Sequence, residues 1–307
     1  MSKLVIDGVG RTFPGVRGGA PTVALQPVSL SVADNDFITI LGPSGCGKST
    51  LLRIVAGLDA PTAGRVILDG ASVTGPGADR GMVFQSYTLF PWLTVRENIC
   101  FGLREKGMGA AQQDEIAAHY LDRTGLAAFE HHYPKMLSGG MQQRTAIARA
   151  LANDPKILLL DEPFGALDNQ TRALMQELLL GIWEAERKTV LFVTHDIEEA
   201  IFVAGRVVVM SARPGRIKAE VAVDLPHPRL YTVKTTPEFS ALKARLTDEI
   251  RGEALAAAPQ ARGNWKSVLA VRLNACLRIN AYDRLTIRNR PQEASRRRLP
   301  IFRNPVI

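Results

Sequence analysis

A glycine-rich run constrains this chain more than any other feature of its sequence. Residues 42–50 read GPSGCGKST and follow Phe37–Leu41, a short apolar run that is typical of a buried central strand. Residues 49–58, which come directly after the loop, carry helical spacing. A strand, a glycine loop and a helix in this order form the setting in which the pattern GxxxxGK[ST] binds phosphate. A chance glycine turn with a lysine is the weaker interpretation.

The residues of this loop have distinct expected roles. The glycines let backbone N–H groups approach phosphate oxygens, and the helix N-terminus adds partial positive charge. The Lys48 ammonium is expected to reach the β- and γ-phosphates, and the Ser49 hydroxyl to ligate Mg²⁺. The predicted nucleotide-binding residues of the loop are Gly42, Pro43, Ser44, Gly45, Cys46, Gly47, Lys48, Ser49 and Thr50.

Strands alternate with helices over most of the chain. Apolar runs predict strands at residues 23–32, 66–68, 82–84, 157–160, 189–193 and 207–210, and helical spacing predicts a helix over 169–186. This alternation predicts an α/β fold with a mostly parallel sheet. Residues 94–153 have a helical pattern, which predicts a helical subdomain inserted into a core formed by residues 1–93 and 154–220. Residues 221–258 are predicted as a C-terminal extension.

Charge is distributed unevenly along the 307 residues. The net charge is +8, but residues 259–307 alone carry 11 basic and 2 acidic residues, and residues 1–258 carry a net charge of −1. The overall basicity is therefore a property of a tail, which predicts little about nucleic-acid binding by the body. We expect this tail to be solvated and poorly ordered, to contact anionic lipid, or to be the product of a non-native reading frame.

Several classes of protein are disfavoured by composition. The three cysteines are widely spaced, which suits a reducing compartment and not a disulfide scaffold. The N-terminus lacks the apolar core of a secretory signal, and no apolar run approaches the roughly 20 residues that span a bilayer. We therefore expect a cytoplasmic protein that reaches a membrane only through a partner.

Two carboxylates follow the apolar run at residues 157–160. Asp161 is placed to hold Mg²⁺ through water, and Glu162 to act as general base toward a water that attacks a phosphate. A strand that ends in Asp-Glu is often only a solvated strand end. The glycine loop elsewhere in the chain makes the chemical interpretation the stronger one.

A second candidate anion site lies at residues 137–144, which read LSGGMQQR and open a predicted helix. Ser138 is a good N-cap, and Gly139 and Gly140 leave the backbone accessible. The simpler interpretation is a helix cap in a loop. Because one nucleotide needs only one phosphate loop, the functional interpretation is a site that serves a neighbouring chain's nucleotide.

Four motifs in this order resemble the ATP-binding subunit of ABC transporters. They are GPSGCGKST, LSGGMQQR, LLDEPFGALD at 159–168 and VTHDIEEA at 193–200, and the resemblance covers about residues 3–250. It implies a P-loop NTPase (RecA-like) core whose inserted helical subdomain contains the signature motif LSGGMQQR. It also implies hydrolysis of ATP, with ATP and Mg²⁺ as the bound species.

The resemblance assigns further roles by position. Gln85 is expected to sense Mg²⁺ and the attacking water, His195 to contact the γ-phosphate, and Asp168 to end the loop that joins two active sites. Phe13 aligns with the aromatic residue that stacks on adenine, although a core phenylalanine is an alternative. The expected catalytic residues are thus Glu162, His195 and Gln85. The expected metal ligands are Ser49, Gln85 and Asp161. Phe13, Ser138, Gly139, Gly140 and Asp168 complete the expected nucleotide contacts.

The expected partners also come from the resemblance. They are a second copy in a head-to-tail dimer with two ATPs at its interface, a transmembrane permease and, indirectly, a periplasmic solute-binding protein. No specific nucleic acid is expected, and the protein would be peripheral on the cytoplasmic side of the inner membrane. Residues 75–103, 161–172 and 211–217 are similar to the nitrate/sulfonate/taurine import class, with residues 90–92 facing the permease. The alternatives are a soluble ABC ATPase that binds nucleic acid through its basic tail and an exporter ATPase.

Overall fold

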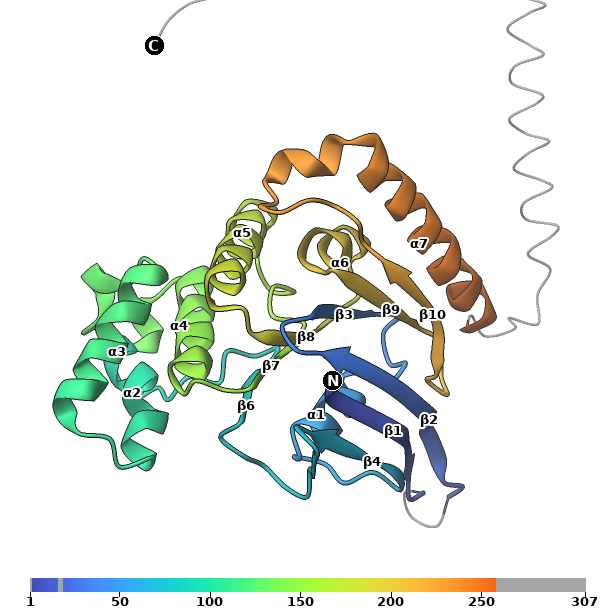
Figure 1. Ribbon diagram of the computed structural model, residues 1–307, viewed down its shortest axis with the longest axis horizontal. Coiled ribbons are helices and arrows are strands. Elements are labelled where there is room, and N and C mark those ends of the chain that lie inside the picture. The colour runs from blue at the N-terminus through green and yellow to red at the C-terminus, as the bar shows by residue number, and fades with distance from the viewer. Residues whose placement is uncertain (1, 16–18, 258–307) are drawn as a thin grey trace, which may run out of the picture. The chain divides into compact units, whose positions relative to one another are not determined.

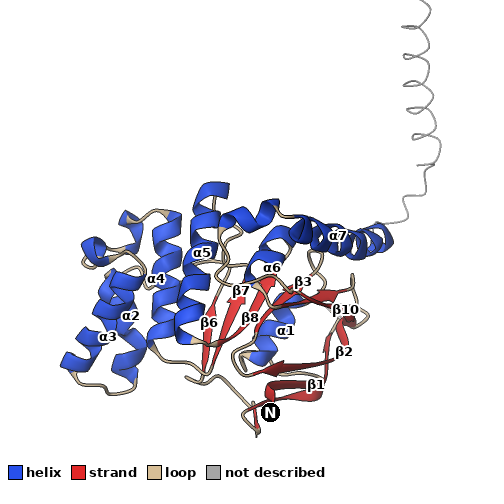
Figure 2. Cartoon of the chain, turned by 45° about the horizontal axis from the view of Figure 1, so that its top comes forward, coloured by secondary structure: helices blue, strands red, loops and turns tan. Residues whose placement is uncertain are grey.

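A six-stranded sheet carries the strand of the glycine loop near its middle (Figures 1 and 2). In order across the sheet, the strands are β10 (Ile217–Ala222), β9 (Arg206–Met210), β3 (Phe37–Leu41), β8 (Thr189–Thr194), β7 (Ile157–Asp161) and β6 (Arg80–Val83). β10 runs antiparallel to β9, and the other neighbouring pairs are parallel. The computed structural model describes residues 2–15 and 19–257, and this sheet confirms the predicted α/β class.

Helices cover both faces of this sheet, and this explains the uninterrupted apolar runs. β3, β7 and β8 are buried at every position. Alternate residues point to opposite faces: Ile38 and Ile40 pack with α1 (Lys48–Val55), whereas Phe37 and Leu41 join the core beneath α5 (Asn169–Glu186) and α6 (Ile197–Val203). The predicted strand over residues 37–41 and the predicted helix over 169–186 have the bounds of β3 and α5.

Two of the predicted strands belong to a second sheet and not to the parallel one. This second sheet is antiparallel, with the order β2 (Thr22–Ala33), β1 (Ser2–Phe13), β4 (Ala63–Leu68) and β5 (Ala71–Ser72). The sequence did not predict β1, and it did not distinguish the strands at 23–32 and 66–68 from those of the parallel sheet. The distinguishing signal is alternation: in the second half of β2, buried apolar residues alternate with exposed polar or small ones, as in a strand with one covered face.

A mainly helical segment lies between β6 and β7, and Figure 1 shows it beside the sheets. Its main helices are α2 (Val95–Glu105), α3 (Ala110–Arg123) and α4 (Gly139–Ala152). α2 begins with a capping box, in which the Thr94 hydroxyl accepts from the Glu97 N–H at 3.3 Å and the Glu97 carboxylate accepts from the Thr94 N–H at 2.8 Å.

The segment after β10 packs onto the core. Val223, Leu225, Phe239 and Leu246 are buried in the same cluster as the α5 and α6 side of the sheet. α7 (Pro237–Ala257) contacts α6, as Figure 1 shows. Within the described residues, no helix combines the length and the apolarity that crossing a bilayer requires. The predicted tail at 259–307 lies outside the described residues.

Candidate nucleotide site

A cavity of about 350 Å³ opens at the N-terminus of α1. It lies at the carboxyl ends of the parallel strands, where ligands bind in open α/β sheets. Its wall brings together residues from distant parts of the sequence. Of the predicted site residues, it contains Phe13, Ser44, Gly45, Gly47, Lys48, Ser49, Thr50, Gln85 and Glu162.

The glycine loop curls around its own lysine. The Lys48 ammonium is buried, donates to the carbonyls of Gly42 at 2.8 Å and Pro43 at 3.1 Å, and lies 3.7 Å from Glu162 Oε1. Gly47 caps α1 with φ of 103°, and a Cβ there would come within 2.6 Å of Leu25 Cδ2. No side chain caps this helix, so its first N–H groups remain available to an anion.

Three predicted loop residues are not part of the cavity wall. Gly42, Pro43 and Cys46 are absent from its wall, and the Cys46 thiol is buried in the core below α1. Burial raises the pKa of this thiol, with the Lys48 charge acting in the opposite direction. These residues can therefore contribute backbone shape, and Cys46 has no exposed thiolate to offer.

Oxygen ligands suited to Mg²⁺ gather around Ser49, which lines the cavity. The Ser49 hydroxyl donates to Asp161 Oδ1 at 2.8 Å, and the Gln85 side chain lies in the same wall. Burial raises the pKa of the Asp161 carboxyl more than the Ser49 hydrogen bond lowers it. A hydroxyl, a buried carboxylate and an amide oxygen are the hard ligands that Mg²⁺ prefers, so the predicted residues fit this ion.

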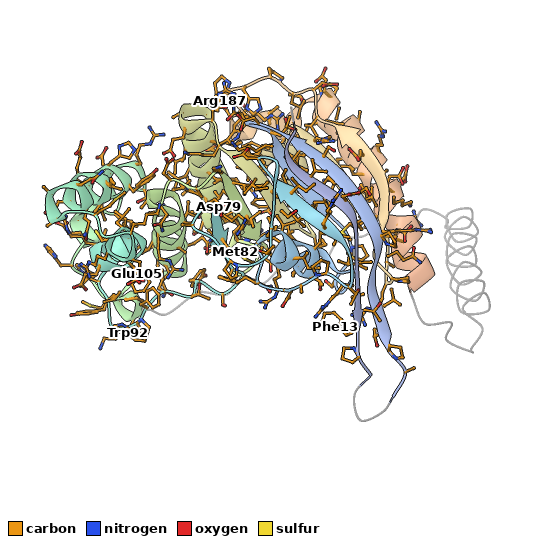
Figure 3. The ribbon with its side chains drawn as sticks, turned by 60° about the horizontal axis from the view of Figure 1, so that its bottom comes forward. Phe13, Asp79, Met82, Trp92, Glu105 and Arg187 are labelled. Atoms are coloured by element: carbon orange, nitrogen blue, oxygen red, sulfur yellow. The ribbon has the colours of Figure 1, made fainter. Side chains whose placement is uncertain are left out.

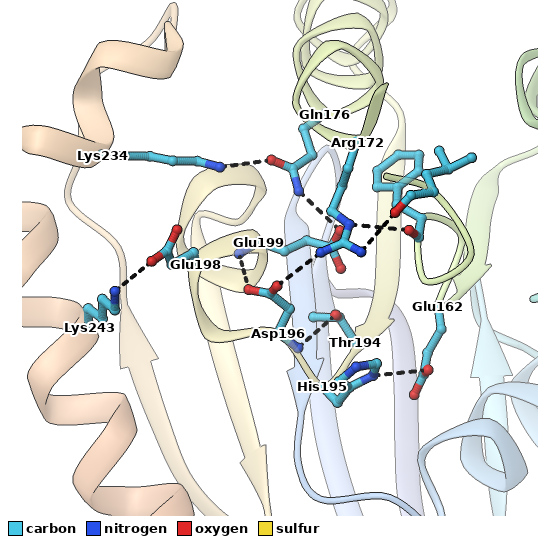
Figure 4. A network of polar contacts seen from close by, with 12 residues as sticks. Glu162, Arg172, Gln176, Thr194, His195, Asp196, Glu198, Glu199, Lys234 and Lys243 are labelled. Carbon is cyan, nitrogen blue, oxygen red and sulfur yellow. Dashed lines mark hydrogen bonds and ion pairs between the residues drawn. The ribbon is translucent and has the colours of Figure 1, made fainter. Parts of the chain in front are cut away.

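Glu162 and His195 come together from adjacent strands, as Figure 4 shows. His195 Nδ1 lies 3.0 Å from Glu162 Oε2, since the ends of β7 and β8 are paired at Asp161 and Val193. The Glu162 backbone has φ of 44°, and its N–H donates to the Val193 carbonyl at 2.9 Å. This arrangement directs a carboxylate toward the cavity and gives it an imidazole partner.

Phe13 forms the outer part of the cavity wall at the end of β1. Its ring is 37% exposed, and the Arg11 guanidinium lies 4.7 Å from its centroid. The alternative of a core phenylalanine therefore does not describe this residue. Figure 3 shows Phe13 near the hairpin of β1 and β2, far from Trp92 in the helical part of the molecule.

The remaining predicted contacts lie elsewhere in the chain. Ser138 caps α4 by accepting from the Met141 N–H at 3.4 Å, and a Cβ on Gly139 would lie 2.9 Å from the Tyr87 hydroxyl. Asp168 caps α5 by accepting from the N–H groups of Gln170 and Thr171, and these bonds lower the pKa of its carboxyl. The cavity of the same chain is lined by none of these four residues, Ser138, Gly139, Gly140 and Asp168.

Arg213 is a cavity residue that the sequence analysis did not identify. Two backbone hydrogen bonds hold the loop that carries Arg213 against β2. The Gly215 N–H donates to the Ala24 carbonyl, and the Gln26 N–H donates to the Gly215 carbonyl, both at 2.9 Å. Arg213 Nη2 lies 4.0 Å from where a Cβ of Gly45 would stand. The available signal was an exposed arginine in the RPGR turn, but only the tertiary structure places that turn next to the phosphate loop.

Replacement of Arg213 by Gln should weaken ATP binding by roughly 10–150-fold, because a charge-assisted contact to phosphate contributes roughly 1.5–3 kcal/mol. Titration of the purified protein with a fluorescent ATP analogue measures this directly. AMP, which lacks the β- and γ-phosphates, should bind both proteins equally. Equal ATP affinity of wild type and variant would remove Arg213 from the site.

Comparison with known proteins shows which family this chain resembles. The family model described as ABC transporter matches residues 25–165. A nitrate import ATP-binding protein of Synechocystis is 49% identical over 81% of this chain and 95% of its own length. An aliphatic sulfonates import ATP-binding protein of Bacillus cereus is 46% identical over 80% of this chain and 94% of its own length.

A solved structure of similar shape is a dimeric ATP-binding cassette in a post-hydrolysis state, bound to ADP and Pi. It is 36% identical, covers 73% of this chain and all of its own, and superposes with a TM-score of 0.64. The chain belongs to the ABC transporter family, in the ATP-binding subunit class. Its fold is that of a P-loop NTPase, as the motifs predict.

Proposed function

We propose that this chain is the ATP-hydrolysing subunit of an importer for a small solute such as nitrate, taurine or another aliphatic sulfonate. The observation that carries the proposal is a cavity whose wall contains glycine-loop residues, Ser49 and Glu162. Asp161 lies behind Ser49 and His195 lies beside Glu162, each within hydrogen-bond distance of its partner. The importer class follows the names of the relatives, which give the nucleic-acid alternative no support.

Each predicted residue has a task in this proposal. The Phe13 ring stacks on the base, Lys48 and the α1 N-terminus bind the polyphosphate, and Ser49, Asp161 and Gln85 hold Mg²⁺. Mg²⁺ held by these residues would supply neutralisation of the charge that develops on the phosphate oxygens. Glu162 accepts the proton of the attacking water, and His195 fixes the carboxylate orientation from 3.0 Å away.

The proposed active form is a head-to-tail dimer. Ser138, Gly139 and Gly140 lie outside the cavity of their own chain, so they act on a nucleotide only if a second chain brings them there. The dimeric state of the similar cassette structure supports this arrangement. Asp168, at the start of α5, is the residue of the intervening loop that we propose to face the partner.

A second hollow is the proposed docking site for the permease. It has a volume of about 550 Å³ and lies between β6 and the helices α2 and α4. Phe90 lines it beneath Phe101 at a ring distance of 4.3 Å, and Arg149 holds the Thr88 carbonyl at 2.8 Å. The nearby Trp92 is 70% exposed, and Figure 3 labels its side chain. Through the permease the chain would sit on the cytoplasmic side of the membrane and respond to a periplasmic solute-binding protein.

The test of this proposal is complementation between two inactive chains. A Lys48→Ala chain and a Ser138→Arg chain should each lack ATPase activity, whereas their purified heterodimer keeps one intact composite site and should regain measurable turnover. A heterodimer no more active than either homodimer, together with no ATP-dependent crosslink between Ser138 and the partner's glycine loop, would contradict the shared site. Uptake of taurine and of nitrate by proteoliposomes that hold the complete transporter then identifies the solute.

We propose the division into the core at 1–93 and 154–220, the subdomain at 94–153 and the extension at 221–258 as the functional organisation. Deletion of residues 259–307 should leave ATP turnover and the melting temperature within error of the full chain, since the deleted residues lie beyond the compact unit that ends at Ala257. Thermal unfolding of both proteins measures this. A melting temperature lower by several degrees would show that the deleted residues contribute to the stability of the fold.

A further inference from the structure

Arg172, in the first turn of α5, contacts two loops at once. Its Nε donates to the Phe164 carbonyl at 3.3 Å and its Nη2 donates to the Leu167 carbonyl at 3.0 Å. Its Nη1 lies 3.5 Å from Asp196 Oδ2. Figure 4 shows this fork between the loop that follows Glu162 and the loop that carries His195.

Each of the two loops carries a residue of the proposed reaction. Residues 162–168 begin with Glu162, whose backbone lies in the left-handed region with φ of 44° and whose carbonyl accepts from the Gly165 N–H at 3.1 Å. A residue other than glycine keeps this conformation only where its surroundings impose it. The second loop holds His195 between Thr194 and Asp196, and the Asp196 N–H donates to the Thr194 hydroxyl at 3.0 Å.

The fork is suited to this task because of its shape. The five guanidinium N–H groups are held in one plane, so one side chain can bond two carbonyls and a carboxylate, whereas an ammonium is a single flexible point. The ion pair alone would contribute little, since the Arg172 and Asp196 side chains are 25% and 36% exposed. The two carbonyl bonds are what fix the loop at 162–168.

The surroundings of Arg172 hold α5 and α6 in register. The Gln176 amide donates to Glu199 Oε1 at 3.1 Å, and the Lys234 ammonium donates to Gln176 Oε1 at 3.1 Å (Figure 4). Asp196 in turn caps α6 by accepting from the Glu199 N–H at 3.0 Å. Arg172 therefore projects from a fixed base, and its own position is set by packed helices.

We propose that Arg172 is a positioning residue that makes the Glu162 loop and the His195 loop move as one unit. This inference rests on the proposed ATP hydrolysis. Arg172 is absent from the wall of the nucleotide cavity, so it acts on the reaction through Glu162 and His195 and not by contact with ATP. Its loss uncouples the 3.0 Å Glu162–His195 contact while the phosphate loop stays intact.

The experiment compares Arg172→Gln and Arg172→Lys in the full chain. The Gln variant should lose about 10–100-fold in kcat, the order expected when a reacting group is displaced by about 1 Å, with Kd for ATP unchanged within twofold. The Lys variant keeps the charge and should recover only part of this loss. Arg65→Gln is the matched control, because Arg65 forms an exposed ion pair with Asp7 on the antiparallel sheet and should behave as wild type.

A second measurement separates positioning from a general effect on stability. In a His195→Ala background, Arg172→Gln should lower kcat by less than threefold more, since the pair that it aligns is already broken. Full additivity of the two losses, or an equal loss of Kd and kcat, would overturn the proposal. Unchanged kcat in a folded Arg172→Gln chain would overturn it as well. Failure of the proposed function is a different result: wild type and Arg65→Gln would then both lack ATP hydrolysis.

Discussion

Replacement of Glu162 by Gln should lower the rate of ATP hydrolysis by about 10²–10⁴-fold while ATP binding is retained, because the amide cannot accept the proton of an attacking water. The amide oxygen keeps the size and position of the carboxylate, so its contact with His195 Nδ1, now 3.0 Å, can persist. The Ser49–Asp161 pair and the uncapped N-terminus of α1 do not involve this side chain. ATP should therefore bind and accumulate in a dimer that does not reopen.

Two measurements check this expectation. Steady-state phosphate release gives the turnover, and size-exclusion chromatography with and without ATP gives the fraction of dimer. Glu220→Gln is a suitable control, since Glu220 forms an ion pair with Arg206 on β9, at a distance from the cavity. Turnover close to wild type in the Glu162 variant would show that another group accepts the proton.

Replacement of Arg229 by Met should lower the free energy of unfolding by about 3–5 kcal/mol, because several buried carbonyls lose their donor at roughly 1–3 kcal/mol each. The buried Arg229 guanidinium donates to five backbone carbonyls. Three of them, at Ile201, Phe202 and Ala204, lie at the end of α6, and two, at Val223 and Leu225, lie in the loop that follows β10. A methionine would leave these oxygens buried without donors.

Burial disfavours the charged form of Arg229 and lowers the pKa of the guanidinium to about 10. The native state thus tolerates an unfavourable charge because five acceptors surround it. Thermal unfolding should show a decrease in Tm on the order of 10 °C for Arg229→Met. Arg65→Met, which breaks only the exposed pair with Asp7, should change stability by less than about 1 kcal/mol. An unchanged Tm for Arg229→Met would mean that water replaces the lost donors.

The elements with strong local signals were predictable from sequence. The apolar run at 37–41 and the helix at 169–186 have the observed bounds, since continuous apolarity and helical spacing are read within one segment. The antiparallel sheet was not predictable in the same way. β1 pairs with β2 and with the distant β4, and this pairing depends on residues that no short window contains.

The candidate site also contains residues that the sequence predicted and residues that only the structure places there. The sequence by itself determined the phosphate loop, the Asp161–Glu162 pair and the class of reaction, because these residues act through fixed local spacing at the end of a strand or the start of a helix. The tertiary structure alone decided that Arg213 enters the cavity and that Arg172 joins two loops. Arginine side chains are long and reach groups far away in sequence, so their partners depend on how strands and helices pack. The order of β7, β8 and β3 within one sheet is what brings those partners within reach.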